Sequence, residues 1–397
     1  MKRPMNRRDF VRGLGAAALA PGLVRMGGCT DPGDEAATDG AAASTDLWPG
    51  YSSALVIDAL AGPIQFNIPQ SQLPLSASDL EAIRSSGITA LNLTVGVVGM
   101  AAESPYEGTL ARMQGWEREF DAHADVLHSV RTIADIGEAK RSGRLGIIHG
   151  FQDTVPFGED LDRIAEFHGL GVRIVQLTYN DRNYVGSGSL VPVDEGLTDF
   201  GAAAVERMDD LGILIDLSHC GARTTMDGIR MARRPVSITH TGCNAVYSHP
   251  RNKDDEALRA TADGGGVVGI YLMPFLTGSG EASLADVVAH IEHALDICGE
   301  DHVGIGTDQG IVPLDTGGDF MAQFDAVSAR RQAAGIAAPR EDTPPIVPEL
   351  NDPRRMDLLA AALADRGHTA SRIEKLLGAN WVRLFGDAWV PQPSGVP

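Results

Sequence analysis

Three short apolar runs of the sequence each end in a side chain that can bind a metal ion, and these side chains are His219, His240 and Asp308. Two neutral imidazoles and one carboxylate on a common rim can bind a single cation, and zinc accepts this set with a fourth position open to water. Because a bound metal lowers the pKa of its water toward neutrality, Asp308 could also accept a proton from that water. A lone histidine after an apolar run is usually structural, so the hypothesis requires all three side chains to lie together.

The elements that must position these residues alternate between short β-branched runs and amphipathic helical segments, which predicts βαβ units and a parallel sheet. Strands are expected at residues 55–60, 88–95, 145–151, 172–178, 213–219, 236–240, 267–272 and 303–308. Eight such alternations favour a (β/α)8 TIM barrel, an α/β fold, over an open doubly wound sheet. Functional side chains of a TIM barrel lie at the C-terminal ends of its strands, where the two histidines and Asp308 are found.

Several helices carry their own signals. Ser78 and Glu81 have the spacing of a capping box, and the segment 285–297 places its apolar residues on one stripe. The segment 310–348 follows the last expected strand and has a helical pattern over 320–334, so we expect a lid or wall over the mouth of the barrel. Residues 357–377 and 379–385 are expected to form closing helices that pack on the barrel. The single barrel domain is predicted to span residues 48–397.

Composition excludes several classes of function. The 397 residues contain 33 Lys and Arg against 53 Asp and Glu, and the resulting net charge of −20 disfavours a nucleic-acid partner. With 43% hydrophobic and 22% charged residues, the chain can bury a large core. No glycine-rich dinucleotide loop and no P-loop motif occurs, so nucleotide chemistry is not indicated.

The four cysteines form no CxxC pair, which argues against a structural zinc ribbon; they are Cys29, Cys220, Cys243 and Cys298. The sequence leaves the disulfide state of the last three open. Strand alternation turns Cys220 away from the face that carries His219, so we expect a buried thiol there.

The first 29 residues differ in kind from the rest. Arg7 and Arg8 in the segment 6–11 resemble a twin-arginine export signal, and the apolar stretch 13–24 is too short to span a membrane. Met26-Gly27-Gly28-Cys29 resembles a lipobox, in which Cys29 would be acylated. Residues 30–47 contain almost no large apolar side chain and are predicted to form a flexible tether. We therefore expect an exported protein, either periplasmic or anchored to the membrane through Cys29.

Five motifs, taken in order, resemble those of the membrane (renal-type) dipeptidases. They are Asp216-Leu217-Ser218-His219-Cys220, Ile238-Thr239-His240, Arg251-Asn252, Gly304-Ile305-Gly306-Thr307-Asp308 and Gly378-Ala379-Asn380. These enzymes are amidohydrolase-like barrels, of the metallo-dependent hydrolase type, that hold two zinc ions and hydrolyse dipeptides, including some with a C-terminal D-residue. The likeness covers nearly all of the chain after Trp48, and it alone implies a dipeptide as substrate.

The resemblance implies a role for each matching residue. His219 and His240 match the two histidines of one zinc site, and Asp308 matches a ligand of the other zinc that is also the proton acceptor. Arg251 matches the arginine that receives the substrate carboxylate, which a guanidinium can bind through two parallel hydrogen bonds. The alternative for Arg251 is a surface ion pair. Tyr179 stands where the family has a substrate-facing histidine, and Asn180 beside it belongs to the same substrate-binding segment.

The departures from the family weaken the metal site. Leu60 and Gly62 occupy the positions of the first-strand histidine and aspartate, so both ligands are lost. Gln152 stands at the bridging glutamate, and its neutral amide cannot balance the charge of two dications. Strand parity places His149 on the face opposite to Gln152, which argues against a replacement ligand. We therefore expect one zinc ion or none, on His219, His240 and Asp308 with Gln152 as a weak ligand.

Three interpretations remain open at this level. The first is an exported metallodipeptidase-like hydrolase with one metal, in which Asp308 and Tyr179 are the catalytic residues and Arg251, Tyr179 and Asn180 bind the substrate. The second is a metal-poor pseudoenzyme that binds a small carboxylate ligand. The third is a non-hydrolytic enzyme acting on a peptide-like metabolite, which Tyr179 and Asp308 facing each other would favour. A homodimer is compatible with all three.

Overall fold

The structure is a computed structural model that describes residues 46–64, 73–333 and 337–390. The predicted export signal, Cys29 and nearly all of the predicted tether 30–47 lie outside the described residues. Among the helices of the described part, none is both long and apolar enough to cross a membrane.

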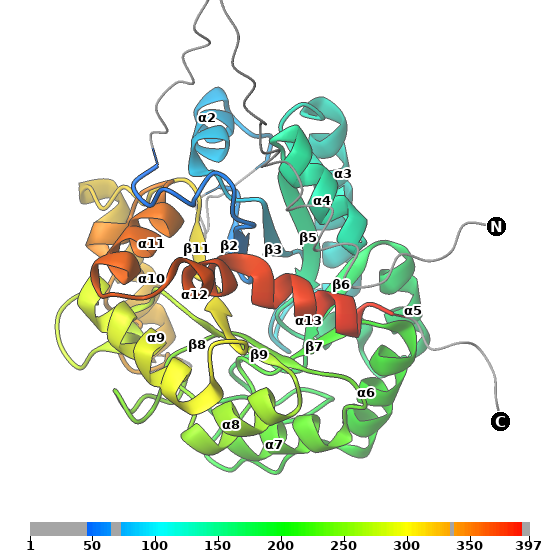
Figure 1. Cartoon of the computed structure of the whole chain (residues 1–397). Coiled ribbons are helices and arrows are strands. Elements are labelled where there is room, and N and C mark those ends of the chain that lie inside the picture. Colours follow the sequence, from blue (N-terminus) through cyan, green and yellow to red (C-terminus); the bar gives the residue numbers. More distant parts are fainter. Residues whose placement is uncertain (1–45, 65–72, 334–336, 391–397) are drawn as a thin grey trace, which may run out of the picture. The chain divides into compact units, whose positions relative to one another are not determined.

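Within the described part, eight parallel strands form a closed barrel with helices around it (Figure 1). In ring order they are β1 (Ile57–Asp58), β3 (Ala90–Thr94), β5 (Leu145–Phe151), β6 (Val172–Gln176), β7 (Leu214–Asp216), β8 (Ser237–Thr241), β9 (Val267–Ile270) and β10 (Val303–Ile305). The Ala59 amide donates a hydrogen bond to the Ile305 carbonyl (3.0 Å) and so joins the end of β1 to β10. The short strands β2 (Ala61–Gly62) and β11 (Gln309–Gly310) continue this seam as a parallel pair. The predicted (β/α)8 barrel is confirmed, and each expected strand overlaps one observed strand.

A further strand, β4 (Leu127–Val130), was not expected from the sequence. It pairs in parallel with the first half of β5, where Leu127 lies opposite Leu145, and β6 pairs with the second half of β5. The two middle residues of β4 are polar and only half-buried, so this strand lacks an apolar, fully buried centre.

Helices fill the connections between the strands. They are α2 (Ala77–Ser86), α3 (Pro105–Ala122), α4 (Ile133–Ser142), α5 (Asp162–Gly169), α6 (Asp199–Leu211), α7 (Ala222–Met231), α8 (Asp255–Asp263) and α9 (Leu284–Cys298). The apolar stripe predicted over 285–297 is α9, which buries Val287, Val288, Ile291 and Ala294. After β11 follow α10 (Gly318–Ala333), α11 (Arg355–Asp365), α12 (Ala370–Glu374), a π-helical turn (Lys375–Ala379) and α13 (Asn380–Ala388).

The capping box predicted at Ser78 and Glu81 is wrong. Ser76 is the N-cap of α2, because its side chain accepts a hydrogen bond from the Asp79 amide (3.2 Å) and the Asp79 carboxylate accepts one from the Ser76 amide (2.8 Å). Asp79, three residues after the cap, accepts the hydrogen bond from the cap amide that a glutamate accepts in the usual capping box.

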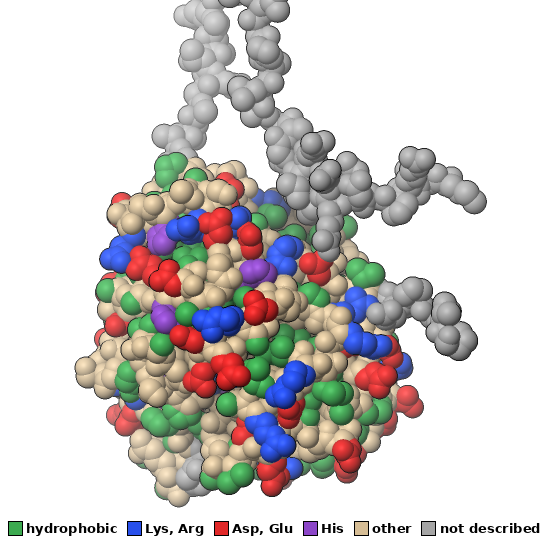
Figure 2. Space-filling model, turned by 60° about the horizontal axis from the view of Figure 1, so that its bottom comes forward, with side chains coloured by type: hydrophobic (Ala, Val, Ile, Leu, Met, Phe, Trp, Pro, Cys, Tyr) green, Lys and Arg blue, Asp and Glu red, His purple; other side chains and the backbone are tan. Residues whose placement is uncertain are grey.

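The outer surface mixes charge types. On the face shown in Figure 2, acidic and basic side chains are interspersed among apolar and neutral ones. Many of the basic side chains form ion pairs, such as Arg366 with Glu292 (2.6 Å) and Arg233 with Asp210 (2.7 Å). On this face, the acidic side chains are therefore dispersed rather than gathered in one patch.

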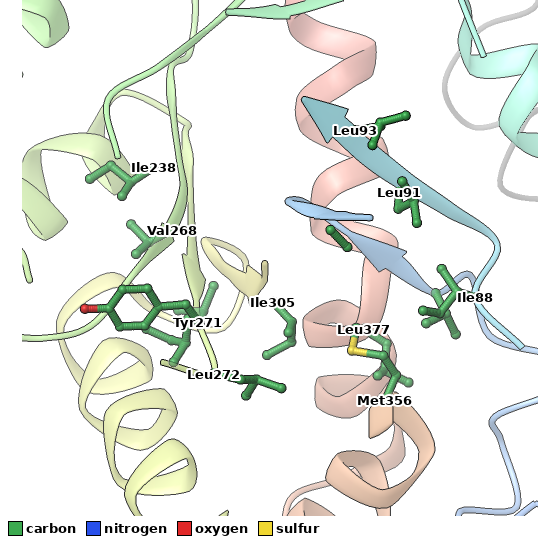
Figure 3. Close-up of a cluster of buried hydrophobic side chains, with 14 of the residues drawn as sticks. Ile88, Leu91, Leu93, Ile238, Val268, Tyr271, Leu272, Ile305, Met356 and Leu377 are labelled. Atoms are coloured by element: carbon green, nitrogen blue, oxygen red, sulfur yellow. The ribbon is translucent and has the colours of Figure 1, made fainter. Parts of the chain in front are cut away.

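The C-terminal helices complete the core. Ile305 and Leu377 belong to one cluster of buried apolar side chains (Figure 3). The Trp381 indole donates a hydrogen bond to the Ile305 carbonyl (3.2 Å), and the side-chain amide of Asn380 donates one to the Val303 carbonyl (2.7 Å). These bonds tie α13 directly to β10, the strand that leads to Asp308.

Candidate active site

A cavity of about 960 Å³ opens where the C-terminal ends of the barrel strands meet α3 and α10. Its lining includes six of the residues singled out from the sequence, namely Gln152, Tyr179, Asn180, His219, Arg251 and Asp308. The seventh, His240, is fully buried, and its ring centre lies 5.0 Å from that of His219. The structure therefore places all seven in or directly beside one cavity.

His219 is held in one tautomer by its neighbour in the cavity. Its Nδ1 atom lies 2.7 Å from the side-chain oxygen of Asn180. Because an amide oxygen only accepts hydrogen bonds, Nδ1 carries the proton and Nε2 carries the lone pair. This Nε2 atom is buried and has no hydrogen-bond partner among the residues that the structure describes.

His240 is oriented by a network that begins at a buried carboxylate. The Thr239 hydroxyl donates to Asp216 (2.7 Å), so its oxygen is left to accept from Nδ1 of His240 (2.9 Å). The Ser218 hydroxyl also donates to Asp216 (2.7 Å) and accepts from the His240 amide (3.1 Å). The Nε2 atom of His240 is likewise buried and finds no partner in the described part of the chain. Asp216 thus fixes the ends of two neighbouring strands.

Both imidazoles are prepared to bind a cation. Burial lowers the pKa of His219 and of His240 well below the usual value, and the nearby positive charges of Arg251 and Lys253 lower both further. The rings are therefore neutral at pH 7, which is the form that ligates metals. Two neutral imidazoles whose ring centres lie 5.0 Å apart have the chemistry of ligands for a divalent cation.

Asp308 shares the cavity but does not complete a compact cluster. Its backbone has φ = 57°, and its amide donates to the Leu60 carbonyl (2.8 Å). The preceding Thr307 is anchored by Asp58, which accepts from its amide (2.8 Å) and its hydroxyl (2.6 Å). In the described ranges, no group of three His, Cys, Asp or Glu side chains is placed to hold a metal ion. The expected three-ligand set is thus present as a histidine pair with Asp308 in the same cavity.

The remaining positions that the sequence analysis considered for the metal site offer no additional ligand to the cavity. Leu60 is buried and Gly62 lines the cavity, and neither has a side chain that can donate a lone pair. His149 stacks on Phe120 of α3, with ring centres 5.8 Å apart, and does not line the cavity. Cys220 is buried, and the cysteines of the described part, Cys220, Cys243 and Cys298, are free thiols.

Arg251 is a buried charge that faces the cavity. Its side chain is 2% exposed and donates to the Ser218 carbonyl (2.7 Å). No carboxylate of the described residues lies within ion-pair distance of its guanidinium, so a surface ion pair is not its role here. A desolvated guanidinium without a counter-ion favours an anionic ligand.

Tyr179 stacks on the ring of His219, with the two ring centres 4.2 Å apart. Burial and the negative charge of Asp308 raise the pKa of Tyr179 to about 12. The phenol is therefore protonated at neutral pH and can donate a hydrogen bond into the cavity.

The sequence analysis missed two parts of the site. The first is the hydrogen-bond network of Asp216, Ser218 and Thr239 that orients His240. The sequence indicates it only through the polar residue directly before each histidine, Ser218 before His219 and Thr239 before His240. The second is the wall that α3 forms with Arg112, Trp116 and Arg118. The outer wall that α10 and residues 341–345 form was expected from the segment 310–348, and there Arg331 pairs with Glu341 (2.8 Å).

Comparison with known families settles the ancestry of this barrel. Residues 57–328 match the family described as membrane dipeptidase (Peptidase family M19). The chain belongs to this family. An amidohydrolase from Pseudomonas aeruginosa of known structure is 32% identical, with a TM-score of 0.72, and the match covers 85% of this chain and 98% of that one.

Two further known proteins are similar to this chain. Dipeptidase verJ of Clonostachys rogersoniana is 30% identical over 241 residues, which are 59% of this chain and 62% of that protein. The chain therefore spans about three fifths of the length of that relative. A metallo peptidase from Rhodobacter sphaeroides, solved with a phosphinate mimic of L-Ala-D-Ala, shares the fold at 22% identity, with a TM-score of 0.68 over 85% of this chain and 99% of that one.

Proposed function

We propose that this M19 protein is a dipeptidase-like hydrolase that cleaves the amide bond of a small peptide-like substrate with a free carboxylate. The histidine pair would hold one divalent cation, most simply zinc. The observation that carries the proposal is a pair of buried Nε2 atoms, on His219 and His240, for which the described residues offer no hydrogen-bond partner. They lie in or beside a cavity that also holds the Arg251 guanidinium, which has no carboxylate partner among the same residues. Membership of a family of metallopeptidases supports the same reaction.

Each residue has a definite task in this reaction. His219 and His240 present their Nε2 atoms, and a cation bound there would supply a polarised water and carbonyl. Arg251 receives the substrate carboxylate and so fixes which amide bond reaches the histidines. The Tyr179 hydroxyl donates to the oxygen that gains negative charge as the amide is attacked. Asp308 accepts the proton of the attacking water and passes it to the leaving amine.

One cation, rather than two, is proposed because of the donors that the chain offers. Leu60 and Gly62 supply none, and the Gln152 amide supplies no charge. Two dications a few ångströms apart need bridging negative charge to offset their repulsion. If Leu60→His, Gly62→Asp and Gln152→Glu together raise the bound metal from one to two ions per chain, these positions are the cause of the reduced site.

The test of the proposal is the metal content of the purified chain, paired with hydrolysis assays over L,L and L,D dipeptides. We expect about one zinc per chain and measurable turnover, and loss of both in His219→Ala with His240→Ala. His293→Ala is the matched control, because His293 lies on α9 and pairs with Asp255 (2.7 Å) outside the cavity. Two tightly bound ions would overturn the single-metal proposal, and no turnover in the zinc-loaded chain would overturn the hydrolase.

A carboxylate-binding pseudoenzyme is the second candidate. It is favoured by the lack of a three-group metal cluster among the described residues. It predicts the same dependence of ligand binding on Arg251 but no dependence of that binding on zinc. Calorimetric titration of a dipeptide into metal-loaded and metal-free chain separates the two functions.

Export and membrane attachment are part of the proposal and rest on the sequence alone. Arg7, Arg8 and Cys29 carry it. Arg7→Lys with Arg8→Lys is expected to retain the precursor inside the cell, since the twin-arginine address would be lost. Cys29→Ala is expected to abolish incorporation of labelled fatty acid, and export without any such label in the unaltered chain would contradict the lipobox.

A further inference from the structure

One face of α3 forms the wall of the cavity on the side of β3. Its lining residues are Ala111, Arg112, Gly115, Trp116 and Arg118. Several pairs of them are three or four residues apart, as in 111/115, 112/116 and 115/118, so they share one broad side of the helix. This face therefore brings two arginines, Arg112 and Arg118, and the Trp116 side chain to the wall of the cavity.

The charge of the cavity is opposite to that of the protein. Among its described lining residues are four arginines, no lysine and two carboxylates, although the whole chain has a net charge of −20. One carboxylate, Glu341, is already paired with Arg331 (2.8 Å). An excess of positive charge concentrated in the cavity of an acidic protein favours anionic ligands.

Arg112 and Arg118 are exposed side chains, and they differ from the ion-paired arginines on the outer surface of the barrel. Arg84 and Arg366 each form an ion pair, with Asp125 (2.9 Å) and with Glu292 (2.6 Å). Neither Arg112 nor Arg118 has a carboxylate within ion-pair distance in the part of the chain that is described. Two cations that line a cavity without a protein counter-ion can accept one from a ligand.

The surroundings of Arg112 are partly desolvated. Its Nη1 atom donates to the Gly96 carbonyl (2.9 Å), and burial lowers its pKa with no acidic neighbour to offset the effect. A guanidinium that has lost part of its hydration binds a carboxylate more strongly than a fully solvated one does.

The α3 wall and Arg251 lie on opposite sides of the barrel. Helix α3 follows β3, whereas Arg251 follows β8, and these strands are four places apart in the ring of eight (Figure 1). A ligand whose carboxylate is bound by Arg251 must therefore direct its other end toward α3. The cavity volume of about 960 Å³ is at the upper end of the range for drug-sized ligands, so it can hold a molecule that reaches both sides.

We propose that Arg112 and Arg118 form an anion subsite that selects peptide-like substrates with a second carboxylate, on the end of the molecule away from Arg251. This inference rests on the proposed function and adds the substrate class to it. The substrate is then a diacid whose two carboxylates are bound across the cavity, with the scissile amide between them beside the histidine pair.

The test compares L-Glu-L-Ala with L-Gln-L-Ala, which have the same shape and differ in one negative charge. We expect kcat/KM to favour the glutamyl peptide by about tenfold or more, as one charge-assisted hydrogen bond would provide. This acid-to-amide ratio should fall in Arg112→Gln and in Arg118→Gln, recover in part in Arg118→Lys, and shrink as salt is added. Arg84→Gln is the control, since Arg84 is paired on the outer surface.

The same peptides are also titrated calorimetrically into each variant, so that the subsite is tested even without turnover. If neither peptide is hydrolysed but the glutamyl peptide binds more tightly in an Arg118-dependent way, the hydrolase fails and the subsite stands. Equal affinities and equal kcat/KM values for the two peptides would overturn the subsite. So would a ratio that is unchanged when Arg112 and Arg118 are both replaced in a chain that retains its melting temperature.

Discussion

The side-chain oxygen of Asn180 lies 2.7 Å from Nδ1 of His219, and this contact decides which nitrogen of the imidazole faces the site. An oxygen that can only accept keeps the proton on Nδ1 and leaves the Nε2 lone pair for a metal ion. A similar arrangement holds His240. The Thr239 hydroxyl donates its proton to Asp216, so its oxygen accepts a hydrogen bond from Nδ1 of His240. Two different partners therefore select the same tautomer in both rings.

Replacing Asn180 tests this tautomer selection. Asn180→Ala removes the acceptor, and we expect zinc affinity to fall about 10- to 100-fold, as is usual for partners that orient a metal-binding histidine. Asn180→Asp keeps an acceptor at the same place and is expected to retain most of the affinity. Competition with a chromophoric chelator measures both. Wild-type affinity in Asn180→Ala would show that the ring needs no such partner.

Arg251 is expected to recognise the free carboxylate of the substrate. Arg251→Met should lower kcat/KM for a dipeptide by about 100-fold, since one charge-assisted, bidentate contact is lost. Arg251→Lys should recover little, because an ammonium cannot form two parallel bonds. The matching control is a dipeptide amide, which lacks the carboxylate and should be a poor substrate for every variant. A loss that is equal for dipeptide and dipeptide amide would assign Arg251 to structure instead.

Asp58 predicts a specific pH dependence of stability. Burial raises the pKa of Asp58 from 3.8 to about 6, against the opposing hydrogen bonds from Thr307. Between about pH 4 and pH 6 the folded chain therefore binds more protons at this position than the unfolded chain. Its contribution to the free energy of unfolding is then greatest below pH 4 and decreases as the pH rises to 6.

Asp58→Asn should remove this decrease. Relative to wild type, the free energy of unfolding of the variant is expected to rise by about 2 kcal/mol from pH 4 to pH 6. Urea unfolding at pH 4, 5, 6 and 7 provides the comparison, in which the other carboxylates cancel. A difference between the two proteins that stays constant over this range would contradict the raised pKa.

The barrel could be predicted because its strands are buried on both faces. Strand β5, for example, is buried at all seven positions from Leu145 to Phe151, and only His149 interrupts its apolar and glycine residues. Strand β4 could not be predicted, because His128 and Ser129 interrupt its apolar pattern. Its pairing with β5 is set by the folded arrangement of the chain and not by its local sequence. The pair β2 and β11 is only two residues long on each side and follows from closure of the ring.

The site could be predicted in its residue types but not in its distances. The rule that functional side chains follow parallel strands located His219, His240 and Asp308. The exact position of Asp308 depends on its left-handed backbone and on the bond from Thr307 to Asp58, 249 residues away in the chain. The wall with Arg112 and Arg118 depends on how α3 packs beside the cavity, which no local pattern specifies.

The last prediction concerns the contact that holds α13 against the strand leading to Asp308. A Cβ atom at Gly304 would lie 2.3 Å from the Trp381 indole nitrogen, inside a fully buried contact. Gly304→Ala must therefore displace Trp381 or β10, and we expect a loss of about 1–3 kcal/mol in the free energy of unfolding. Gly386 lies on α13, the helix that carries Trp381, but a Cβ atom at Gly386 meets no atom within 4 Å. Gly386→Ala should be neutral or stabilise by up to about 1 kcal/mol, because alanine favours the helix. Thermal and urea unfolding of the two variants separate close packing from helix propensity, and equal stability of both would refute the packing argument.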